Sequence, residues 1–151
     1  MAIEIERQGL AFYQGCVAAR ATESVAEVFD YAAEQQRRYI ERFSKMKRDL
    51  AEYSVPEGYP GETVGYLRGF ISGRLFTSVD DASCSAEAVR DELEAVELAV
   101  ELERSTIAFY SGVKQIVRES ERDVIDEIIS EQHRHIRRLL QLRNQLERGE
   151  A

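Results

Sequence analysis

The sequence has few residues that break helices and few cysteines. Only two of its 151 residues are proline, and it contains no Asn-Gly or Asp-Gly pair, so long helices are favoured over β-hairpins. Its two cysteines, Cys16 and Cys84, are far apart and lack C-x-x-C spacing. A zinc ribbon or another four-thiolate metal site is therefore excluded, and we expect both thiols to be buried or partly buried.

Positive charge is also scarce. The chain has 20 Lys and Arg residues against 28 Asp and Glu residues, which gives a net charge of −8. A chain this acidic has no general attraction for nucleic acid or an anionic membrane. No apolar run approaches the roughly 20 residues that span a bilayer, and the N-terminus does not resemble a signal peptide. We therefore expect a cytoplasmic protein with neither nucleic acid nor a membrane as its partner.

The composition is that of a globular domain. Hydrophobic residues make up 44% of the chain and charged residues 32%, which argues against disorder. A length of 151 residues is enough to bury one core. Residues 1–151 are therefore expected to form a single domain.

Apolar residues recur at spacings of three and four along the first third of the chain, which predicts helices. A first helix is expected over residues 2–21. Ser24 and Glu27 predict a capping box, in which each side chain binds a free backbone amide of the first turn. The second helix that they open should end near Tyr53, because prolines and glycines follow.

The same periodicity continues in the rest of the chain, which predicts an all-α protein. Residues 63–76 are expected to form a short helix that crosses the end of the bundle, and residues 78–85 a polar loop. A third helix is expected over 86–117, and Ser120 with Asp123 predicts the capped start of a fourth. Two helical hairpins joined by one long crossover follow from this order.

The two halves of the chain are similar to each other. The motif E-x-x-G-x-x-F-Y occupies Glu6–Tyr13, and E-x5-F-Y begins 97 residues later, at Glu103–Tyr110. Gln36 and Gln132 correspond in the same way at an offset of 96 residues. Such a repeat is a natural way to build a two-fold site between two helix pairs.

Polar residues interrupt the apolar stripe of each predicted long helix. They are Glu6, Gln36, Glu103, Gln132 and His135. A buried carboxylate without a partner is costly by several kcal/mol. A metal ion would compensate this cost, and so would a shared proton or hydrogen bonds from Tyr, Gln and His. The residues alone leave a metal site and a hydrogen-bonded core equally open.

These features resemble the rubrerythrin-like branch of the ferritin-like superfamily over essentially the whole chain. The similar features are the E-x6-Y pattern of the first and third helices, the Y-L-x-x-F…F segment over 66–76, and the second helix of each pair. The resemblance implies a ferritin-like four-helix bundle of two helical hairpins, joined by a crossover that contains a short helix. It also implies a di-iron centre, held by one Glu from each first helix and an E-x-x-H pair from each second helix.

This chain keeps only part of the ligand set that the resemblance implies. Three positions match the family and three are altered: Glu6, Glu103 and His135 match, whereas Gln36, Tyr39 and Gln132 replace Glu, His and Glu. The six residues are the candidate metal ligands, for one or two ions of iron or manganese. Because only two carboxylates remain and Gln is a weak donor to a hard cation, a single ion held by the three matching residues is one interpretation. A metal-free, hydrogen-bonded core is the other.

Acidic and basic residues beside these positions are expected to lie outside the core. Glu34 and Glu131 are one or two residues from altered ligand positions, a shift that turns them by roughly 100 to 200° around the helix. His133 should face away from the site for the same reason. The arginines of the second and fourth helices interleave with glutamates and are expected to form surface salt bridges: Arg37, Arg38, Arg134, Arg137 and Arg138.

The resemblance implies a non-haem iron oxidoreductase that reduces peroxide or oxygen. Because the chain has no four-cysteine module, the electrons would come from a separate protein. The alternative function is a non-catalytic bundle that has lost the di-iron centre and serves an interaction or structural role. Glu6 lies in the first turns of its helix, which leaves one edge of the bundle uncovered and favours a homodimer.

Overall fold

The computed structural model describes residues 2–19, 21–52 and 75–150, with the backbone alone for 46–52. Within these ranges the protein is all-helical and contains no β-strand. The helices are α1 (Ala2–Ala18), α2 (Glu23–Glu52), α4 (Val79–Ala88), α5 (Glu92–Ile116) and α6 (Glu119–Arg148). The prediction of an all-α protein is confirmed for the described part of the chain.

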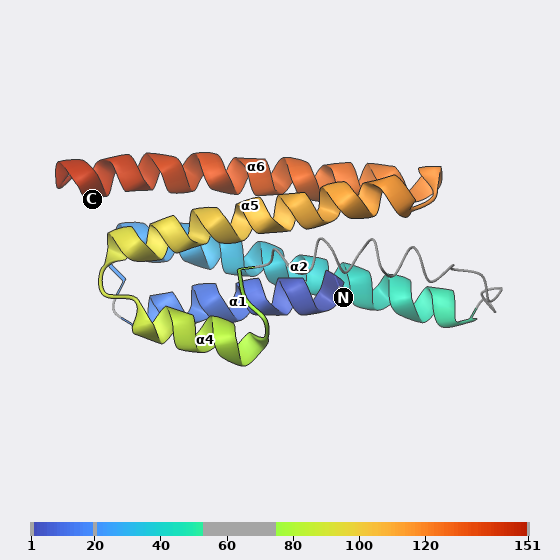
Figure 1. Ribbon diagram of the computed structural model, residues 1–151, viewed down its shortest axis with the longest axis horizontal. Helices are drawn as coiled ribbons and strands as arrows, with labels where there is room; N and C mark the ends of the chain where they lie inside the picture. The colour runs from blue at the N-terminus through green and yellow to red at the C-terminus, as the bar shows by residue number, and fades with distance from the viewer. Residues whose placement is uncertain (1, 20, 53–74, 151) are drawn as a thin grey trace.

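The long helices form two antiparallel pairs (Figure 1). α1 packs on α2 and α5 packs on α6, while the shorter α4 lies along α1. Contacts between α1 and α5, and between α2 and α6, join the two pairs. Four long helices therefore share one interior, into which each of them can direct side chains.

The first two helices lie close to their predicted positions. α1 ends at Ala18, three residues earlier than expected. α2 begins at Glu23, so Ser24 lies inside the first turn and its predicted role as the cap is wrong. The reason is that the backbone hydrogen bonds of the helix start earlier: the N–H of Ala26 donates to the carbonyl of Thr22 at 2.8 Å. The short helix predicted over 63–76 falls outside the described residues, except for its last two positions.

The predicted polar loop over 78–85 is wrong, because residues 79–85 lie in the helix α4. The hydroxyl oxygen of Ser78 accepts the N–H of Asp81 at 3.0 Å and caps α4. α4 ends at Ala88, and Asp91 then caps α5 by accepting the N–H of Glu94 at 2.9 Å. The third long helix therefore begins at Glu92 and not at residue 86.

Both ends of α6 are defined by local hydrogen bonding. The N–H of Arg118 donates to the carboxylate of Glu121 at 3.3 Å, so Ser120 lies inside the helix and its predicted role as the cap is wrong. Gly149 ends the helix in the left-handed conformation, with φ at 68°. Glycine adopts this conformation without steric cost, which makes it a common C-terminal stop.

The apolar interior is divided in two along the helix axes. One buried cluster includes Phe12, Phe29, Val96 and Leu139. The other includes Ile5, Tyr39, Phe109 and Ile128. In each long helix, the buried polar residues lie in sequence between the members of these two clusters. The polar residues therefore form a layer with apolar side chains above and below it.

Candidate metal centre

The five polar residues predicted to interrupt the apolar stripes are all buried. Glu6, Glu103 and Gln132 have no exposed surface, and Gln36 and His135 are each 2% exposed. They come from all four long helices. The prediction that each of these helices sends a hydrogen-bonding group into the core is confirmed.

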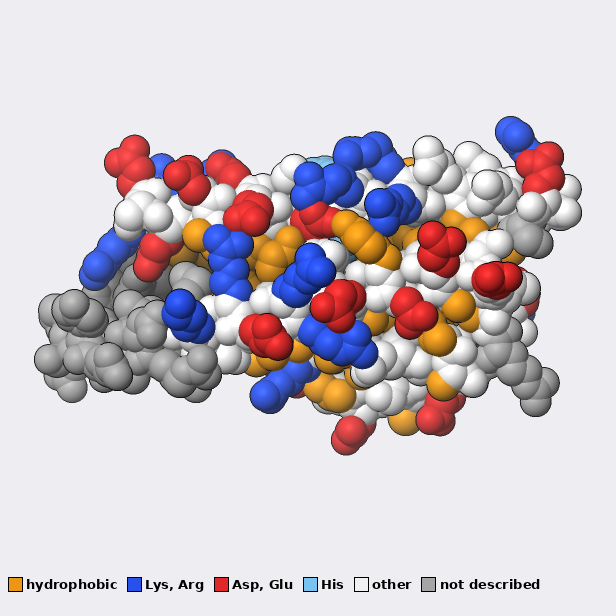
Figure 2. Space-filling view, turned by 180° about the vertical axis from the view of Figure 1, so that it is seen from behind, with side chains coloured by type: hydrophobic (Ala, Val, Ile, Leu, Met, Phe, Trp, Pro, Cys, Tyr) orange, Lys and Arg blue, Asp and Glu red, His pale blue; other side chains and the backbone are white. Residues whose placement is uncertain are grey.

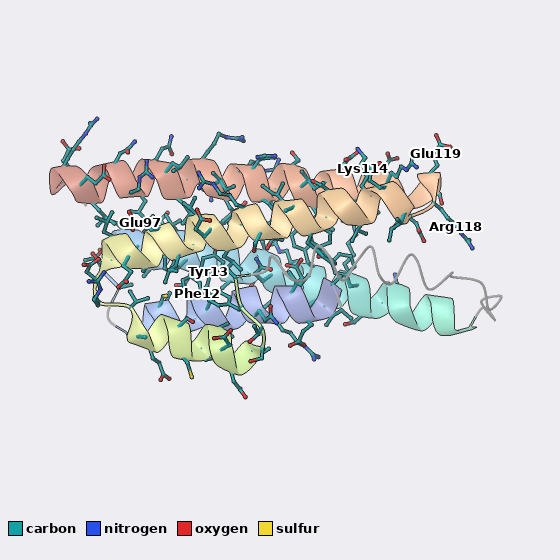
Figure 3. The ribbon with its side chains drawn as sticks, in the orientation of Figure 1. Phe12, Tyr13, Glu97, Lys114, Arg118 and Glu119 are labelled. Carbon is teal, nitrogen blue, oxygen red and sulfur yellow. The ribbon has the colours of Figure 1, made fainter. Side chains whose placement is uncertain are left out.

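The two buried carboxylates are held by a reciprocal pair of tyrosines. Tyr110 on α5 donates a hydrogen bond to Oε1 of Glu6 on α1. Tyr13 on α1 donates to Oε1 of Glu103 on α5. Each tyrosine follows the glutamate of its own helix by seven residues, which is two turns and places both on one face. Figure 3 shows side chains filling the space between α1 and α5, where Tyr13 is labelled.

Burial changes the acid–base chemistry of these groups. It raises the pKa of Glu6 to about 8, a rise that the hydrogen bond from Tyr110 reduces and the nearby Glu103 increases. Burial and the adjacent carboxylates raise the pKa of both Tyr13 and Tyr110 well above its usual value. The tyrosines therefore remain protonated hydrogen-bond donors. In the metal-free protein, the raised pKa favours the protonated form of Glu6.

Several buried atoms in the same layer have no hydrogen-bond partner among the described residues. They are Oε2 of Glu6, Oε2 of Glu103, Oε1 of Gln36 and both amide atoms of Gln132. An unsatisfied buried polar group costs about 1 to 3 kcal/mol, and more when it is charged. Oxygen donors from all four helices thus converge on a layer where only some of them are satisfied.

His135 lies between two carboxylates. Its Nδ1 atom is 3.3 Å from Oε1 of Glu103, and its Nε2 atom is 3.3 Å from Oε1 of Glu131. The second contact is close, but it does not meet the angular requirements of a hydrogen bond. A neutral imidazole carries one N–H, so it can donate a hydrogen bond to only one of the two carboxylates. The other nitrogen then has a lone pair that can bind a cation.

The prediction that Glu131 points outward is wrong. Its side chain is only 8% exposed, and Tyr31 on α2 donates to its Oε1 at 2.9 Å. Arg134 forms an ion pair with its other oxygen. These two partners compensate the burial of the charge, which explains how a residue adjacent to the inward stripe stays in the core. The predictions for Glu34 and His133 are confirmed, since both are exposed.

A signal for Glu131 was present in the sequence. Glu131 precedes His135 by four residues, a spacing that puts two side chains on the same face of a helix. The prediction considered only its displacement from Gln132. Tyr31, the partner across the helix pair, was also missed, because no pattern within one helix identifies a contact between α2 and α6.

Gln36 lies directly against the backbone of α1. A Cβ atom added to Gly9 would be 3.1 Å from both Cδ and Nε2 of Gln36. That separation is tighter than ordinary van der Waals contact, so the amide occupies the space that a larger residue would need. Gly9 follows Glu6 by one helical turn, and its lack of a side chain lets Gln36 reach the level of the carboxylates.

Tyr39 occupies the position where the resemblance implies a second histidine. It is 6% exposed and belongs to the apolar cluster with Phe109 and Ile128. Burial, with the charges of Glu6 and Glu127, raises the pKa of Tyr39 to about 12. The neutral phenol is therefore the favoured form, and it is a poor ligand compared with the imidazole that the resemblance implies at this position.

The charge of the two buried carboxylates would suit one divalent ion better than two. Among the described residues, no three His, Cys, Asp or Glu side chains converge closely enough to form a metal site by themselves. The amide oxygens of Gln36 and Gln132 are the other oxygens in the layer that have no hydrogen-bond partner within the described part of the chain. Two carboxylates balance the charge of one divalent cation, whereas two such cations would keep a charge of +2 in a buried layer.

The remaining predicted side chains lie on or near the surface. Arg37 and Arg38 pair with Glu34 at 3.2 and 3.6 Å, as predicted. Arg138 differs, because its guanidinium group lies over the ring of Tyr31 at 4.0 Å from the centroid. Figure 2 shows basic and acidic side chains mixed over this outer face. Such mixing is typical of a solvated surface.

The two cysteines differ in environment. Cys16 is buried, and burial raises the pKa of its thiol to about 12. Cys84 is exposed on α4, which corrects the expectation that both thiols are at least partly buried. Both are free thiols. Neither belongs to the polar layer.

Comparison of the chain with models of protein families, with curated proteins and with solved structures gives no match. None of the helices in the described ranges has the length and apolar character required to cross a membrane. We therefore infer the function from the residues of the polar layer.

Proposed function

We propose that this chain is a rubrerythrin-like protein with the ferritin-like fold, which binds one divalent iron or manganese ion between its two helix pairs. One observation carries the proposal. Glu6 and Glu103 each have one carboxylate oxygen held by a tyrosine of the opposite helix and the other oxygen buried without a partner. Carboxylates that bind metals are commonly oriented by such outer hydrogen bonds.

The ion would be held by the free oxygens of Glu6 and Glu103, by a ring nitrogen of His135 and by the amide oxygens of Gln36 and Gln132. Tyr13 and Tyr110 orient the carboxylates. Mixed oxygen and imidazole ligands suit iron(II) and manganese(II). Binding would release the proton that Glu6 carries at neutral pH, because a ligating carboxylate must be ionised.

Iron bound in this layer would supply reduction of peroxide or oxygen as its chemistry. The described structure offers no second redox group, so a separate protein would deliver the electrons. The proposal includes a homodimer. Glu6 lies in the first turns of α1, so one edge of the bundle would be uncovered in a single chain. The side chains would have separate roles: the carboxylates bind the ion, the tyrosines orient the carboxylates, and the apolar clusters exclude water.

A second function is favoured by a specific observation. Glu6 and Glu103 each accept a hydrogen bond from a tyrosine, and burial raises the pKa of Glu6 to about 8 in the metal-free protein. These hydrogen bonds satisfy part of the layer without any ion. The alternative is therefore a metal-free bundle in which the former ligands form a polar core and the protein serves an interaction or structural role.

Metal content and stability distinguish the two functions. The protein would be purified without chelator, incubated anaerobically with Fe²⁺ or Mn²⁺, and analysed for bound metal. The proposal expects about one equivalent per chain, and an increase of about 2.7 kcal/mol in stability when the free metal is 100 times its Kd. The Glu6→Gln/Glu103→Gln variant keeps the shape of both side chains and should lose the metal and the stabilisation.

The matched control is Glu97→Gln, which removes one exposed carboxylate from α5. It should bind metal like the unaltered chain. If the unaltered chain holds no metal and its melting temperature is the same with metal and with chelator, the metal-binding function is wrong and the metal-free bundle takes its place.

A further inference from the structure

A groove with a volume of about 900 Å³ lies between α2 and α6. Its lining runs along both helices, from Ser24 and Arg148 to Tyr31 and Arg138. About one turn before Arg138 on α6 lies His135, which is buried in the polar layer. The groove therefore ends at Tyr31 and Arg138, directly beside the polar layer.

The ring of Tyr31 separates this groove from the imidazole of His135. Tyr31 is partly buried and lines the groove. Its ring meets that of His135 edge to face, with centroids 5.6 Å apart and an interplanar angle of 81°. His135 itself is only 2% exposed. The same tyrosine thus borders the open groove and covers a buried histidine.

Two contacts at the edge of the groove hold the Tyr31 ring in place. Its hydroxyl group donates to Oε1 of Glu131 at 2.9 Å. The guanidinium group of Arg138 lies over the ring, 4.0 Å from its centroid. Single contacts of these kinds near solvent are weak. The ring can therefore leave this position by a local motion, without unfolding of the helices.

The imidazole atom nearest to these contacts is Nε2. The other ring nitrogen, Nδ1, faces Oε1 of Glu103 at 3.3 Å. Nε2 has no hydrogen-bond partner in the described ranges, and it lies 3.3 Å from the same Glu131 oxygen to which Tyr31 donates. When Nδ1 carries the proton, Nε2 has a free lone pair. A reactive nitrogen therefore lies behind Tyr31.

We propose that Tyr31 is a gate: its ring, held by Glu131 and Arg138, closes a route by which small solutes pass from the groove to His135. The gate goes beyond the proposed function, because it is a property of the fold and requires no metal. In a metal-binding protein the same route would admit the ion.

The test measures how fast a small reagent reaches His135 in the full-length chain with chelator present. Diethyl pyrocarbonate transfers an ethoxycarbonyl group to an unprotonated ring nitrogen, with release of carbon dioxide and ethanol, and mass spectrometry follows the product. The chain has two histidines and two cysteines. A His133→Asn/Cys84→Ser background therefore leaves His135 and Cys16 as the only residues of each type.

Cys16 supplies a control within the same molecule. It is a buried free thiol in the apolar cluster that contains Phe12 and Phe29. Its reaction with N-ethylmaleimide reports opening of the bundle as a whole. A gate at Tyr31 should change the reaction of His135 and leave that of Cys16 unchanged.

Four variants are compared in this background. Tyr31→Ala removes the ring. Tyr31→Phe keeps the ring and loses the hydrogen bond to Glu131, and Arg138→Gln loses the charge over the ring. Val28→Ala is the matched control, because it shortens another side chain of the groove wall, about one turn earlier on α2.

Modification of His135 should be slow in the unaltered background and faster by about tenfold or more in Tyr31→Ala, since the ring no longer has to be displaced. Tyr31→Phe and Arg138→Gln should give smaller increases, because each loses one of the two contacts. Val28→Ala should match the background protein. The rate at Cys16 should be the same in all of these proteins.

Three results would overturn the inference: an unchanged His135 rate in Tyr31→Ala, an equal increase in Val28→Ala, or an increase at Cys16 that parallels the one at His135. If Tyr31→Ala does not fold, Tyr31→Phe and Arg138→Gln decide the question. An unchanged His135 rate in both would then show that Tyr31 is not a gate. Because chelator is present throughout, the answer does not depend on whether the chain binds a metal.

Discussion

The hydroxyl group of Tyr110 on α5 donates a hydrogen bond to Glu6 on α1, although the two residues are 104 positions apart in the chain. The bond crosses between the two helix pairs, and Tyr13 with Glu103 forms its counterpart in the opposite direction. Because each pair joins a helix of the first half to a helix of the second, the two bonds fix how the halves meet. They also fix one oxygen of each carboxylate and leave the other free.

Removing one of these hydroxyl groups should destabilise the protein. In Tyr110→Phe, Glu6 keeps its burial and loses its donor, at a cost of about 1 to 3 kcal/mol. Tyr13→Phe should lose a similar amount because it is the equivalent residue of the repeat. Urea unfolding in the presence of chelator measures the change. Tyr31→Phe is the control and should lose less, because Glu131 keeps its ion pair with Arg134.

The effect of both substitutions together tests the reciprocal arrangement. If the two bonds stabilise one shared layer, the double variant should differ from the sum of the single variants by more than about 0.5 kcal/mol. A free energy of unfolding that is unchanged in both single variants would mean that the tyrosines do not hold the carboxylates.

The free energy of unfolding of the metal-free protein should depend on pH through Glu6. Burial raises its pKa from 4.5 to about 8, so the folded protein binds this proton more tightly than the unfolded chain does. Its contribution to stability is fully present below about pH 4.5 and is lost as the pH rises through about 8. Urea unfolding between pH 5 and 9 should show this decline in the unaltered chain and a flatter profile in Glu6→Gln.

The comparison of the two profiles isolates Glu6 from the other carboxylates, which contribute equally to both proteins. The Glu97→Gln variant, altered at an exposed position, should follow the unaltered chain. Parallel profiles for Glu6→Gln and the unaltered chain would show that Glu6 ionises at the same pH in the folded and unfolded states.

The helices and the buried polar positions were predictable because they depend on periodicity within one helix. The three- and four-residue spacing of apolar side chains places Glu6, Gln36 and His135 on the inner stripe whatever the neighbouring helices are. Helix starts were less predictable. Ser78 and Asp91 cap α4 and α5 although other Ser and Asp residues lie nearby, and α6 starts after Arg118, which has no side-chain capping hydrogen bond.

Contacts between helices could not be predicted from those patterns. The burial of Glu131 depends on Tyr31 lying opposite it on α2, and the hydrogen bond from Tyr13 to Glu103 depends on the register of α1 against α5. Neither register is encoded by the spacing of residues in a single helix. The repeat nevertheless indicated which glutamates would meet, because a two-fold arrangement places corresponding residues at the same level.

Gly9 should influence metal binding through Gln36. In Gly9→Ala, the new Cβ would lie 3.1 Å from Cδ and Nε2 of the amide, so the Gln36 side chain must move. Calorimetry should then show weaker Mn²⁺ binding. Gly15→Ala is a matched control: its Cβ would be 2.7 Å from that of Ala86 on α4, so it should reduce stability without changing the Kd for Mn²⁺.

The coupling between the two residues can be measured directly. Gly9→Ala should have no further effect on Mn²⁺ affinity once Gln36→Ala has removed the amide. If Gly9→Ala weakens binding equally with and without Gln36, the glycine acts through another part of α1 and the role of the Gln36 oxygen is wrong.

Restoring the ligands that the resemblance implies should convert the layer into a two-ion site. The Gln36→Glu/Tyr39→His/Gln132→Glu variant would contain four carboxylates and two histidines at the six candidate positions, enough negative charge to balance two divalent cations. Metal analysis should rise from about one to about two equivalents per chain. The metal-free variant should be less stable than the unaltered chain, because two more carboxylates are buried without partners, and saturating Fe²⁺ should reverse that loss.

Glu34→Gln, which alters an exposed glutamate of α2, controls for a change of charge outside the layer. An unchanged metal content in the triple variant, with the fold intact, would show that the backbone of this bundle does not have the geometry for two ions.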